Sequence, residues 1–350
     1  MQIFNRCFWC KILEVVSVFK CLGFYINSTG FHCRGIRELI TTARRALFGL
    51  KKRMAKYPEL IPSMQLELFQ RTVEPILLYV CEVWGYSKFD QLERFFLSFL
   101  KNILFVKIST PNCFVYGELG VFPLYIEQRL RVIKYWLKLI RPSYSMCSYT
   151  KLIYREMLNL NTTHPNSSTW VTHVKNMLDN CGMGNFWKDQ VVNDEFDFIS
   201  LFKQRMYDIY QQEWMAEVNS TSDYRLFKHL KENFCFEEYL NIFNKPIRIA
   251  LTKLRLSSHL FHVERGRWNA RKLDIKDRVC SLCNVIEDEF HCLIECPRYS
   301  SARVGNLPNY LKKKPSMYKF INVLRCDEPE ICQKLGILCL KIMREHRKFI

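Results

Sequence analysis

Residues 35–56, GIRELITTARRALFGLKKRMAK, decide the fold class of this chain. The apolar side chains of this stretch recur at intervals of three and four residues, the spacing that lines one face of an α-helix. They are Ile36, Ile40, Ala43, Leu47, Leu50 and Met54. Residues 89–103 and 126–140 repeat the same spacing, so the sequence predicts a mainly α-helical protein with a bundle over residues 31–141.

A second stripe on the first predicted helix is basic. Arg37, Arg44 and Lys51 recur every seven residues, and Arg45 and Lys52 lie beside them. We therefore expect a helix that buries one face and presents cations on another. An ordinary solvated face explains this pattern as well as a binding face does.

The other segments complete the expected architecture. Residues 15–27 are rich in β-branched and aromatic side chains and end at a Ser-Thr-Gly break, which predicts a strand or hairpin. Ser63 is expected to cap the next helix, and Pro75 to kink it before residues 76–84. The predicted parts are an N-terminal β-hairpin remnant, a helical bundle, a helical connection, a small cysteine-rich module and a C-terminal helical tail. Their expected bounds are residues 1–30, 31–141, 142–245, 246–305 and 306–350.

Composition and charge narrow the class of protein. The chain has 350 residues, of which 49% are hydrophobic, and this excludes wholesale disorder. It lacks the ~18-residue apolar run of a membrane span and a secretory signal, so we expect an intracellular protein, nuclear or cytoplasmic, whose 16 cysteines are largely reduced.

The net charge of +18 is unevenly distributed. Residues 1–141 and residues 241–350 each carry a net +11, and the region between them carries −4. Two basic lobes of this kind favour a polyanionic partner, with nucleic acid ahead of a membrane surface. Solubility alone would also explain the charge.

The most specific motif in the chain is a C-x2-C-x7-H-x4-C array formed by Cys280, Cys283, His291 and Cys296. Three thiolates and one imidazole suit a single tetrahedral Zn²⁺, and four protein ligands close the site, which makes the ion structural. Cys292, beside His291, is the residue most easily mistaken for a ligand. The N-terminal Cys7-x-x-Cys10 pair has no partner at a usable spacing.

Upstream of this array, arginine and aromatic side chains occur together. Arg255, Arg265, Arg267 and Trp268 suit phosphate contact and base stacking. Packing of arginine on Trp268 and pairing with Glu264 is an equally good interpretation.

Signatures of common enzymes are missing from the sequence. It contains no phosphate-binding G-x-x-x-x-G-K-[ST], no H-E-x-x-H, no G-x-S-x-G and no Asp-Asp dipeptide. A two-metal phosphoryl-transfer site needs two or three carboxylates around the ions, so we do not expect an enzyme.

Several motifs, in their order along the chain, resemble the C-terminal part of the reverse transcriptase of non-LTR (LINE-type) retrotransposons. Phe19-Lys-Cys-Leu-Gly-Phe24 is similar to the primer-grip hairpin of that family, with Cys21 in place of the usual Tyr. Pro75-Ile-Leu-Leu-Tyr79, Cys81-Glu-Val-Trp-Gly85 and Tyr116-Gly-Glu-Leu-Gly120 are similar to its thumb. The segment from Leu254 through the cysteine array is similar to the zinc-binding module that ends many of its polyproteins.

The resemblance implies a primer-grip hairpin, a thumb-like bundle and a zinc-binding module with one structural Zn²⁺. In that family the catalytic aspartates precede the primer grip, and this chain begins at the grip. We therefore expect a truncated reverse-transcriptase-derived protein that binds RNA or DNA with weak sequence specificity and lacks a polymerase site. The expected nucleic-acid contacts are Lys20, Arg37, Arg44, Arg45, Lys51, Lys52, Arg255, Arg265, Arg267 and Trp268.

The alternative is a host-retained protein-interaction module that zinc stabilises. Salt-sensitive retention on single-stranded nucleic acid would favour the first interpretation, and indifference to nucleic acid the second.

Overall fold

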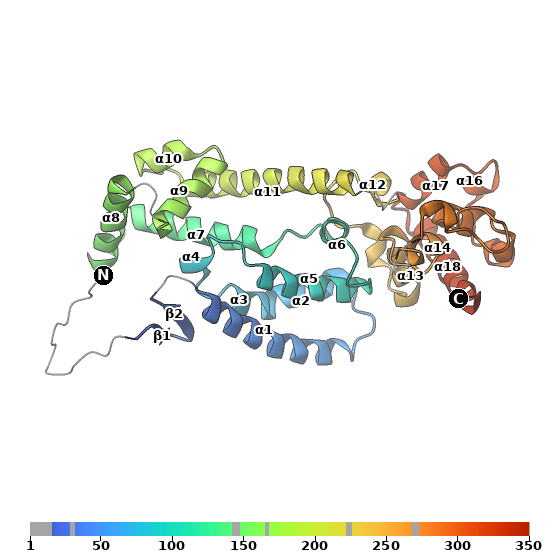
Figure 1. Ribbon diagram of the computed structural model, residues 1–350, viewed down its shortest axis with the longest axis horizontal. Helices are drawn as coiled ribbons and strands as arrows, with labels where there is room; N and C mark the ends of the chain where they lie inside the picture. Colours follow the sequence, from blue (N-terminus) through green and yellow to red (C-terminus); the bar gives the residue numbers. More distant parts are fainter. Residues whose placement is uncertain are drawn as a thin grey trace.

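The computed structural model describes residues 16–28, 32–141, 148–164, 168–221, 226–267 and 273–349. The protein is mainly helical, with one two-stranded antiparallel hairpin near its N-terminal end, which confirms the predicted fold class. Figure 1 shows an elongated molecule in which the hairpin and the C-terminal helices lie toward opposite ends.

The hairpin pairs β1 (Val18–Cys21) with β2 (Phe24–Asn27) around a turn at Leu22 and Gly23. Both turn residues have positive φ, 45° and 89°, as tight hairpin turns require. The Phe24 ring stacks against Trp84 at 6.3 Å, and the Tyr79 hydroxyl donates a hydrogen bond to the Leu22 carbonyl at 2.6 Å. These contacts dock the hairpin onto the helical bundle.

The bundle consists of helices that each bury one apolar face. Its phenylalanines stack at the centre, where the Phe69 and Phe99 rings lie 4.3 Å apart. The helices are α1 (Cys33–Met54), α2 (Pro62–Thr72), α3 (Glu74–Leu77), α4 (Cys81–Trp84), α5 (Asp90–Leu104), α6 (Asn112–Leu119) and α7 (Leu124–Ile140).

Two local expectations for the bundle were wrong. Helix α2 starts at Pro62, which takes the first helical position, so Ser63 does not cap it. Residues 76–84 do not form one helix after Pro75. Helix α3 ends at Leu77, and Val80, in a left-handed conformation with φ 54°, immediately precedes α4.

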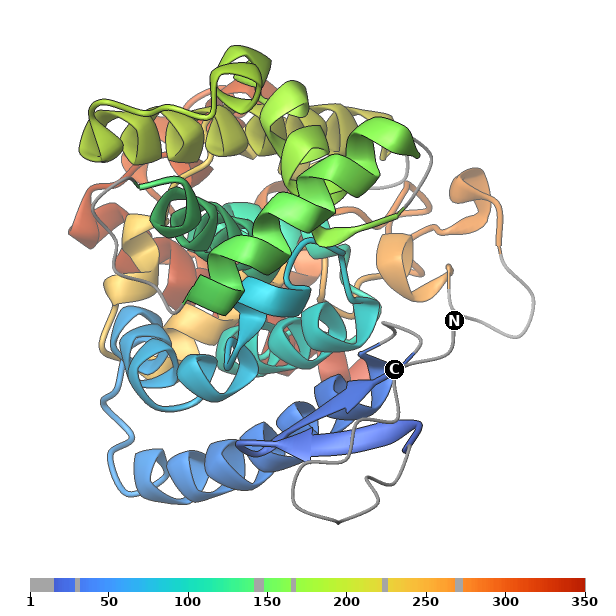
Figure 2. The same ribbon diagram turned by 90° about the vertical axis from the view of Figure 1, so that its left-hand side faces the viewer.

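A layer of further helices covers the bundle (Figure 2). The long helix α11 packs closely on α6, since a Cβ atom on Gly117 would lie 2.6 Å from the Trp214 ring. The Trp214 indole N–H donates to the Cys113 carbonyl at 2.7 Å. The helices of this layer are α8 (Ser148–Thr163), α9 (Trp170–Asn180), α10 (Gly184–Asp189), α11 (Glu195–Ser220) and α12 (Phe227–Leu230).

The C-terminal part packs around one long helix, α18, against which α13 lies so closely that a Cβ atom on Gly336 would meet Ile247 at 2.3 Å. Its helices are α13 (Lys245–Arg255), α14 (His262–Arg265), α15 (Ser300–Arg303), α16 (Asn309–Lys312), α17 (Met317–Leu324) and α18 (Pro329–His346). Short 3₁₀ turns lie at Glu238–Asn241, Ile275–Asp277, Pro297–Tyr299 and Arg347–Phe349.

Most of the buried apolar side chains form one connected cluster from Phe24 in the hairpin to Ile342 in α18. Within the described ranges, every helix is too short or too polar to cross a lipid bilayer.

Candidate metal centre and basic groove

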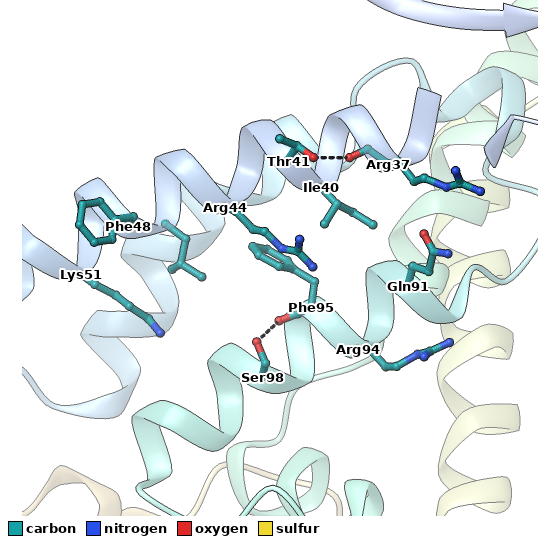
Figure 3. Close-up of a pocket in the computed structure, with 11 residues that line it drawn as sticks. Arg37, Ile40, Thr41, Arg44, Phe48, Lys51, Gln91, Arg94, Phe95 and Ser98 are labelled. Carbon is teal, nitrogen blue, oxygen red and sulfur yellow. Dashed lines mark hydrogen bonds between the residues drawn. The ribbon is translucent and has the colours of Figure 1, made fainter. Parts of the chain in front are cut away.

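A groove of about 690 Å³ runs between α1 and α5. Arg37, Arg44 and Lys51 line it from α1, and Arg94 lines it from α5. Figure 3 shows these side chains along the two helices, with Gln91 and Ser98 on the α5 wall. The seven-residue stripe of the sequence is therefore one wall of a real concavity, which we call the basic groove.

The charged side chains that line the basic groove are all positive. Among the described residues that line it, none carries a carboxylate. Burial lowers the pKa of Lys51, because its ammonium is partly withdrawn from water with no anion to compensate. Phe48 stands 74% exposed at the groove, an unusual position for a large aromatic ring on a helix. The arrangement presents four cations and one free aromatic face.

Other predicted contacts on this side of the molecule lie outside the groove. Arg45 and Lys52 are exposed on α1 but do not line it. Lys20 is exposed on β1, with its ammonium 5.3 Å from the Tyr25 ring centre, and the Arg34 guanidinium lies 4.4 Å from the same ring.

The predicted contact at Arg255 was wrong, because this side chain is only 2% exposed. Its guanidinium pairs with Glu118 at 2.7 Å and with Glu237 at 2.5 Å, and donates to the Leu324 carbonyl. Each of its three guanidinium nitrogens donates inside the protein, so this buried side chain is not available to a phosphate.

The remaining basic residues of that segment divide between the two interpretations left open by the sequence. Arg265 is exposed, whereas Arg267 is largely buried and pairs with Glu264 at 3.2 Å. That pairing is the structural alternative. Trp268 lies outside the described residues.

Sequence reasoning missed Arg94 and Phe48. Arg94 does not belong to the apolar stripe of α5, so its exposure could have been predicted from the sequence. Its closeness to α1 could not, because it depends on how the two helices pack. Phe48 interrupts the polar face of α1 between Arg44 and Lys51, and an aromatic ring between cations was an available signal.

The predicted metal ligands come together in the C-terminal part of the protein. One ligand atom each from Cys280, Cys283, His291 and Cys296 lies within 4.8 Å of the others. The Cys296 sulfur is 3.9 Å from that of Cys280 and 3.8 Å from that of Cys283. Distances of this size between ligand atoms suit one tetrahedral ion with Zn–S bonds of about 2.3 Å.

Local backbone structure positions the ligands. A tight turn bounded by the bridge between Val279 and Ile286 carries Cys280 and Cys283, and the Cys280 N–H donates to the Val285 carbonyl at 2.7 Å. His291 begins a π-helical turn, His291–Glu295, and its N–H donates to the Asp288 carboxylate at 2.8 Å. Cys296 closes that turn through its own N–H, which donates to the His291 carbonyl at 2.8 Å.

Two features of the cluster fit a divalent cation. Both ring nitrogens of His291 are buried without a hydrogen bond among the described residues, although Nδ1 lies 3.5 Å from the Glu295 carboxylate, and a metal bond would satisfy one of the two. Burial raises the pKa of the Cys280 thiol, but the Leu282 N–H, the neighbouring His291 imidazole, the Cys283 N–H and the Cys296 thiol together outweigh this and bring it down to about 7. Burial and the neighbouring Cys280 raise the pKa of Cys296 to about 12. Crowded thiols of this kind ionise together only around a cation.

Neighbouring residues serve the fold. Cys292 is fully buried and is not part of the cluster. His259 is buried with Nε2 2.9 Å from Glu289, a contact that holds its ring in place.

Comparison of the chain with protein-family models, curated proteins and solved structures gave no match, so both sites rest on their own geometry.

Proposed function

We propose that this protein binds nucleic acid through the basic groove between α1 and α5. The observation that carries the proposal is the convergence of Arg37, Arg44, Lys51 and Arg94 on one concave surface without a lining carboxylate. Phosphate backbones are the partners that such a surface attracts, and their affinity is dominated by neutralisation of phosphates by Lys and Arg.

The spacing of the cations suits a strand that lies along α1. Seven helical residues rise about 10 Å, so Arg37 and Lys51 are separated by roughly 21 Å along the helix axis. Phosphates of one stacked strand recur every ~3.4 Å, and the groove therefore spans about six nucleotides. Phe48 offers a stacking face for one base, and stacking does not discriminate strongly among sequences. We expect weak sequence specificity.

The resemblance to non-LTR reverse transcriptases supports the same assignment. The hairpin and the Tyr79 segment, which carry that resemblance, touch each other through the Tyr79–Leu22 hydrogen bond. By this resemblance the bundle is thumb-like and holds a primer–template backbone. Since the sequence contains no Asp-Asp pair, we propose binding without polymerisation, and labelled nucleotide is not expected to be incorporated on a primed template.

We further propose that Cys280, Cys283, His291 and Cys296 hold one structural Zn²⁺. The closeness of the four ligand atoms supports this, as does the burial of both His291 ring nitrogens without a hydrogen bond among the described residues. Four protein ligands leave no open coordination position for chemistry, so the ion would contribute folding free energy only.

The salt dependence of binding tests the groove. For a labelled 12-nucleotide single strand, four phosphate contacts predict a slope of log K against log[salt] of about −3. Arg37→Gln/Arg44→Gln removes two contacts, so the slope should fall to about −1.4 and affinity at 0.1 M salt should drop roughly 10- to 30-fold. Fluorescence anisotropy at several salt concentrations measures both quantities.

Arg45→Gln/Lys52→Gln is the matched control, because it removes the same charge from the same helix outside the groove. It should keep most of the slope and affinity. Equal losses in both double variants would mean that net charge, and not the groove, drives binding. Indifference of the wild-type chain to nucleic acid at low salt would overturn the proposal and favour the protein-interaction alternative.

A further inference from the structure

A second concavity lies where the bundle meets the C-terminal part of the protein. It encloses about 230 Å³ and is formed by three segments far apart in the sequence. They are residues 105–107 after α5, residues 253–261 at the end of α13 and beyond, and residues 343–347 at the end of α18. We call it the junction pocket.

Hydrogen bonds fix the walls of the junction pocket. The Lys107 N–H donates to the Ser258 hydroxyl oxygen at 2.9 Å, and the Lys107 ammonium donates to the His259 carbonyl at 2.9 Å. The His259 ring is in turn held by Glu289. The loop after α5 and the loop after α13 are therefore positioned relative to each other before any ligand arrives.

Three permanent cations line this pocket: Lys107, Lys253 and Arg347. Among the described residues, neither Lys253 nor Arg347 forms an ion pair, and no lining residue carries a carboxylate. The nearby carboxylates already have partners: Glu264 pairs with Arg267, and Glu289 and Glu287 contact the lining histidines His259 and His346 from behind the wall. Burial and the charge of Arg347 lower the pKa of Lys253, as expected for like charges brought together.

We propose that the junction pocket is a binding site for a phosphate dianion, either free or as the terminal phosphate of a nucleic-acid strand. A tetrahedral oxyanion accepts hydrogen bonds from ammonium and guanidinium groups and neutralises their mutual repulsion. The volume is several times the ~30 Å³ of one water, so a phosphate and part of its substituent fit. Phe105 and Leu260, which are partly exposed in the wall, would contact that substituent.

The position of the junction pocket favours the terminal phosphate of a nucleic-acid strand as its ligand. Helix α5 forms one wall of the basic groove as far as Ser98, and it leads to Phe105 at the pocket. These two residues are separated by roughly 10 Å along the chain axis, about three nucleotide steps of a stacked strand. The phosphate site itself does not depend on groove binding.

Calorimetric titration of the full, zinc-supplemented chain with inorganic phosphate at constant ionic strength tests the site. We expect saturable binding of one phosphate per chain. Lys253→Gln and Arg347→Gln should each weaken it about tenfold, the usual effect of one charge-assisted hydrogen bond. Arg344→Gln is the matched control: Arg344 lies three residues before Arg347, in the last turn of α18, is exposed and does not line the pocket, so the affinity of this variant should stay within about twofold of wild type.

Two results would overturn the site: no saturable binding by the wild-type chain in the millimolar range, or wild-type affinity in both pocket variants. Arg347 is exposed near the chain end, so Arg347→Gln decides the matter if Lys253→Gln does not fold. Arg37→Gln/Arg44→Gln should keep phosphate binding while losing strand binding, which separates failure of the groove from failure of the pocket.

Oligonucleotides distinguish the two sources. If the ligand is a strand end, a 12-nucleotide strand with a 5′- or 3′-phosphate should bind more tightly than the hydroxyl-ended strand, and Arg347→Gln should abolish that difference. If the ligand is the free anion, the phosphorylated and hydroxyl-ended strands should bind alike and inorganic phosphate alone should respond to Arg347→Gln.

Discussion

At the scale of single residues, Arg255 shows what burial does to a basic side chain. It belongs to a network with Glu118, Glu237 and Lys231, in which Lys231 also pairs with Glu237. The Tyr239 hydroxyl donates to Glu118 at 2.6 Å. The partner carboxylate Glu118 lies 137 residues away in the sequence. No local pattern could reveal that this arginine faces inward.

Loss of the Arg255 guanidinium should strongly destabilise the protein. Arg255→Met leaves the Glu118 carboxylate, which is 0% exposed, without its compensating charge. Removal of one partner of a buried pair typically costs about 3–5 kcal/mol of unfolding free energy. Urea unfolding followed by circular dichroism measures the loss.

Arg255→Met/Glu118→Leu completes the test, because it removes both charges together. The double variant should recover part of the lost stability, since an apolar pair replaces a stranded carboxylate. Arg265→Met, an exposed arginine ten residues further on, should cost little. A loss below about 1 kcal/mol in Arg255→Met would contradict the buried network.

Glu74 should make the stability of the bundle depend on pH. Burial raises the pKa of Glu74 to about 7, the Glu127 carboxylate adds to the rise, and Arg131 opposes it. A carboxyl whose folded pKa exceeds its unfolded value of 4.5 stabilises the fold below pH 4.5, and this contribution is lost as the pH rises through 7.

Glu74→Gln cannot ionise, so it should gain stability relative to wild type between pH 4.5 and 7 and keep that gain at pH 8. We expect a gain on the order of 1–2 kcal/mol, since solvent screens this partly exposed group. Thermal melts at pH 4.5, 6 and 8 measure it. Glu59→Gln, which removes an exposed carboxylate, is the control. A difference from wild type that is constant over this range would contradict the argument.

At the scale of elements, the periodicity of apolar residues predicted the helices and turns that depend mainly on interactions between residues close in the sequence. The stripes of α1, α5 and α7 follow from three- and four-residue spacing, and the turn that carries Cys280 and Cys283 follows from its motif. The four predicted metal ligands all fall within 17 consecutive residues, so their spacing alone nearly defined the Cys/His cluster.

The features that the sequence did not predict depend on contacts between elements that are far apart along the chain. The packing of α1 beside α5 creates the basic groove, and nothing in the sequence of either helix indicates that it packs beside the other. The break at Val80 places a β-branched residue at φ 54°, against its intrinsic preference, so tertiary packing must impose it. Helix α8 also extends over 16 residues in a stretch whose composition indicates a linker around one short helix.

At the scale of the whole molecule, one continuous apolar core joins the helical bundle to the C-terminal part, and different interactions stabilise these two parts. The bundle has long helices and stacked aromatic side chains. The Cys/His cluster instead joins short turns, and its carboxyl-terminal flank is held by Arg303, which donates to the Cys296 carbonyl. Loss of the metal should therefore destabilise the C-terminal part more than the bundle.

Removal of the metal should unfold mainly the region after Ala250 and leave the bundle folded. We expect about one Zn²⁺ per chain by elemental analysis, and loss of that ion in Cys283→Ser, because three ligands no longer close the site. Cys33→Ser, which removes an exposed cysteine outside the cluster, should keep the ion.

Hydrogen exchange locates the effect of that loss. In Cys283→Ser, peptides that cover residues 278–303 should lose protection, whereas peptides from α5 should keep it because Phe96 and Phe99 remain buried in the bundle. The link from Arg255 to Glu118 sets the boundary, since it ties α13 to α6 independently of the ion. Uniform loss of protection would show that the connected core unfolds as one unit. Protein purified under reducing conditions with no zinc would refute the metal centre.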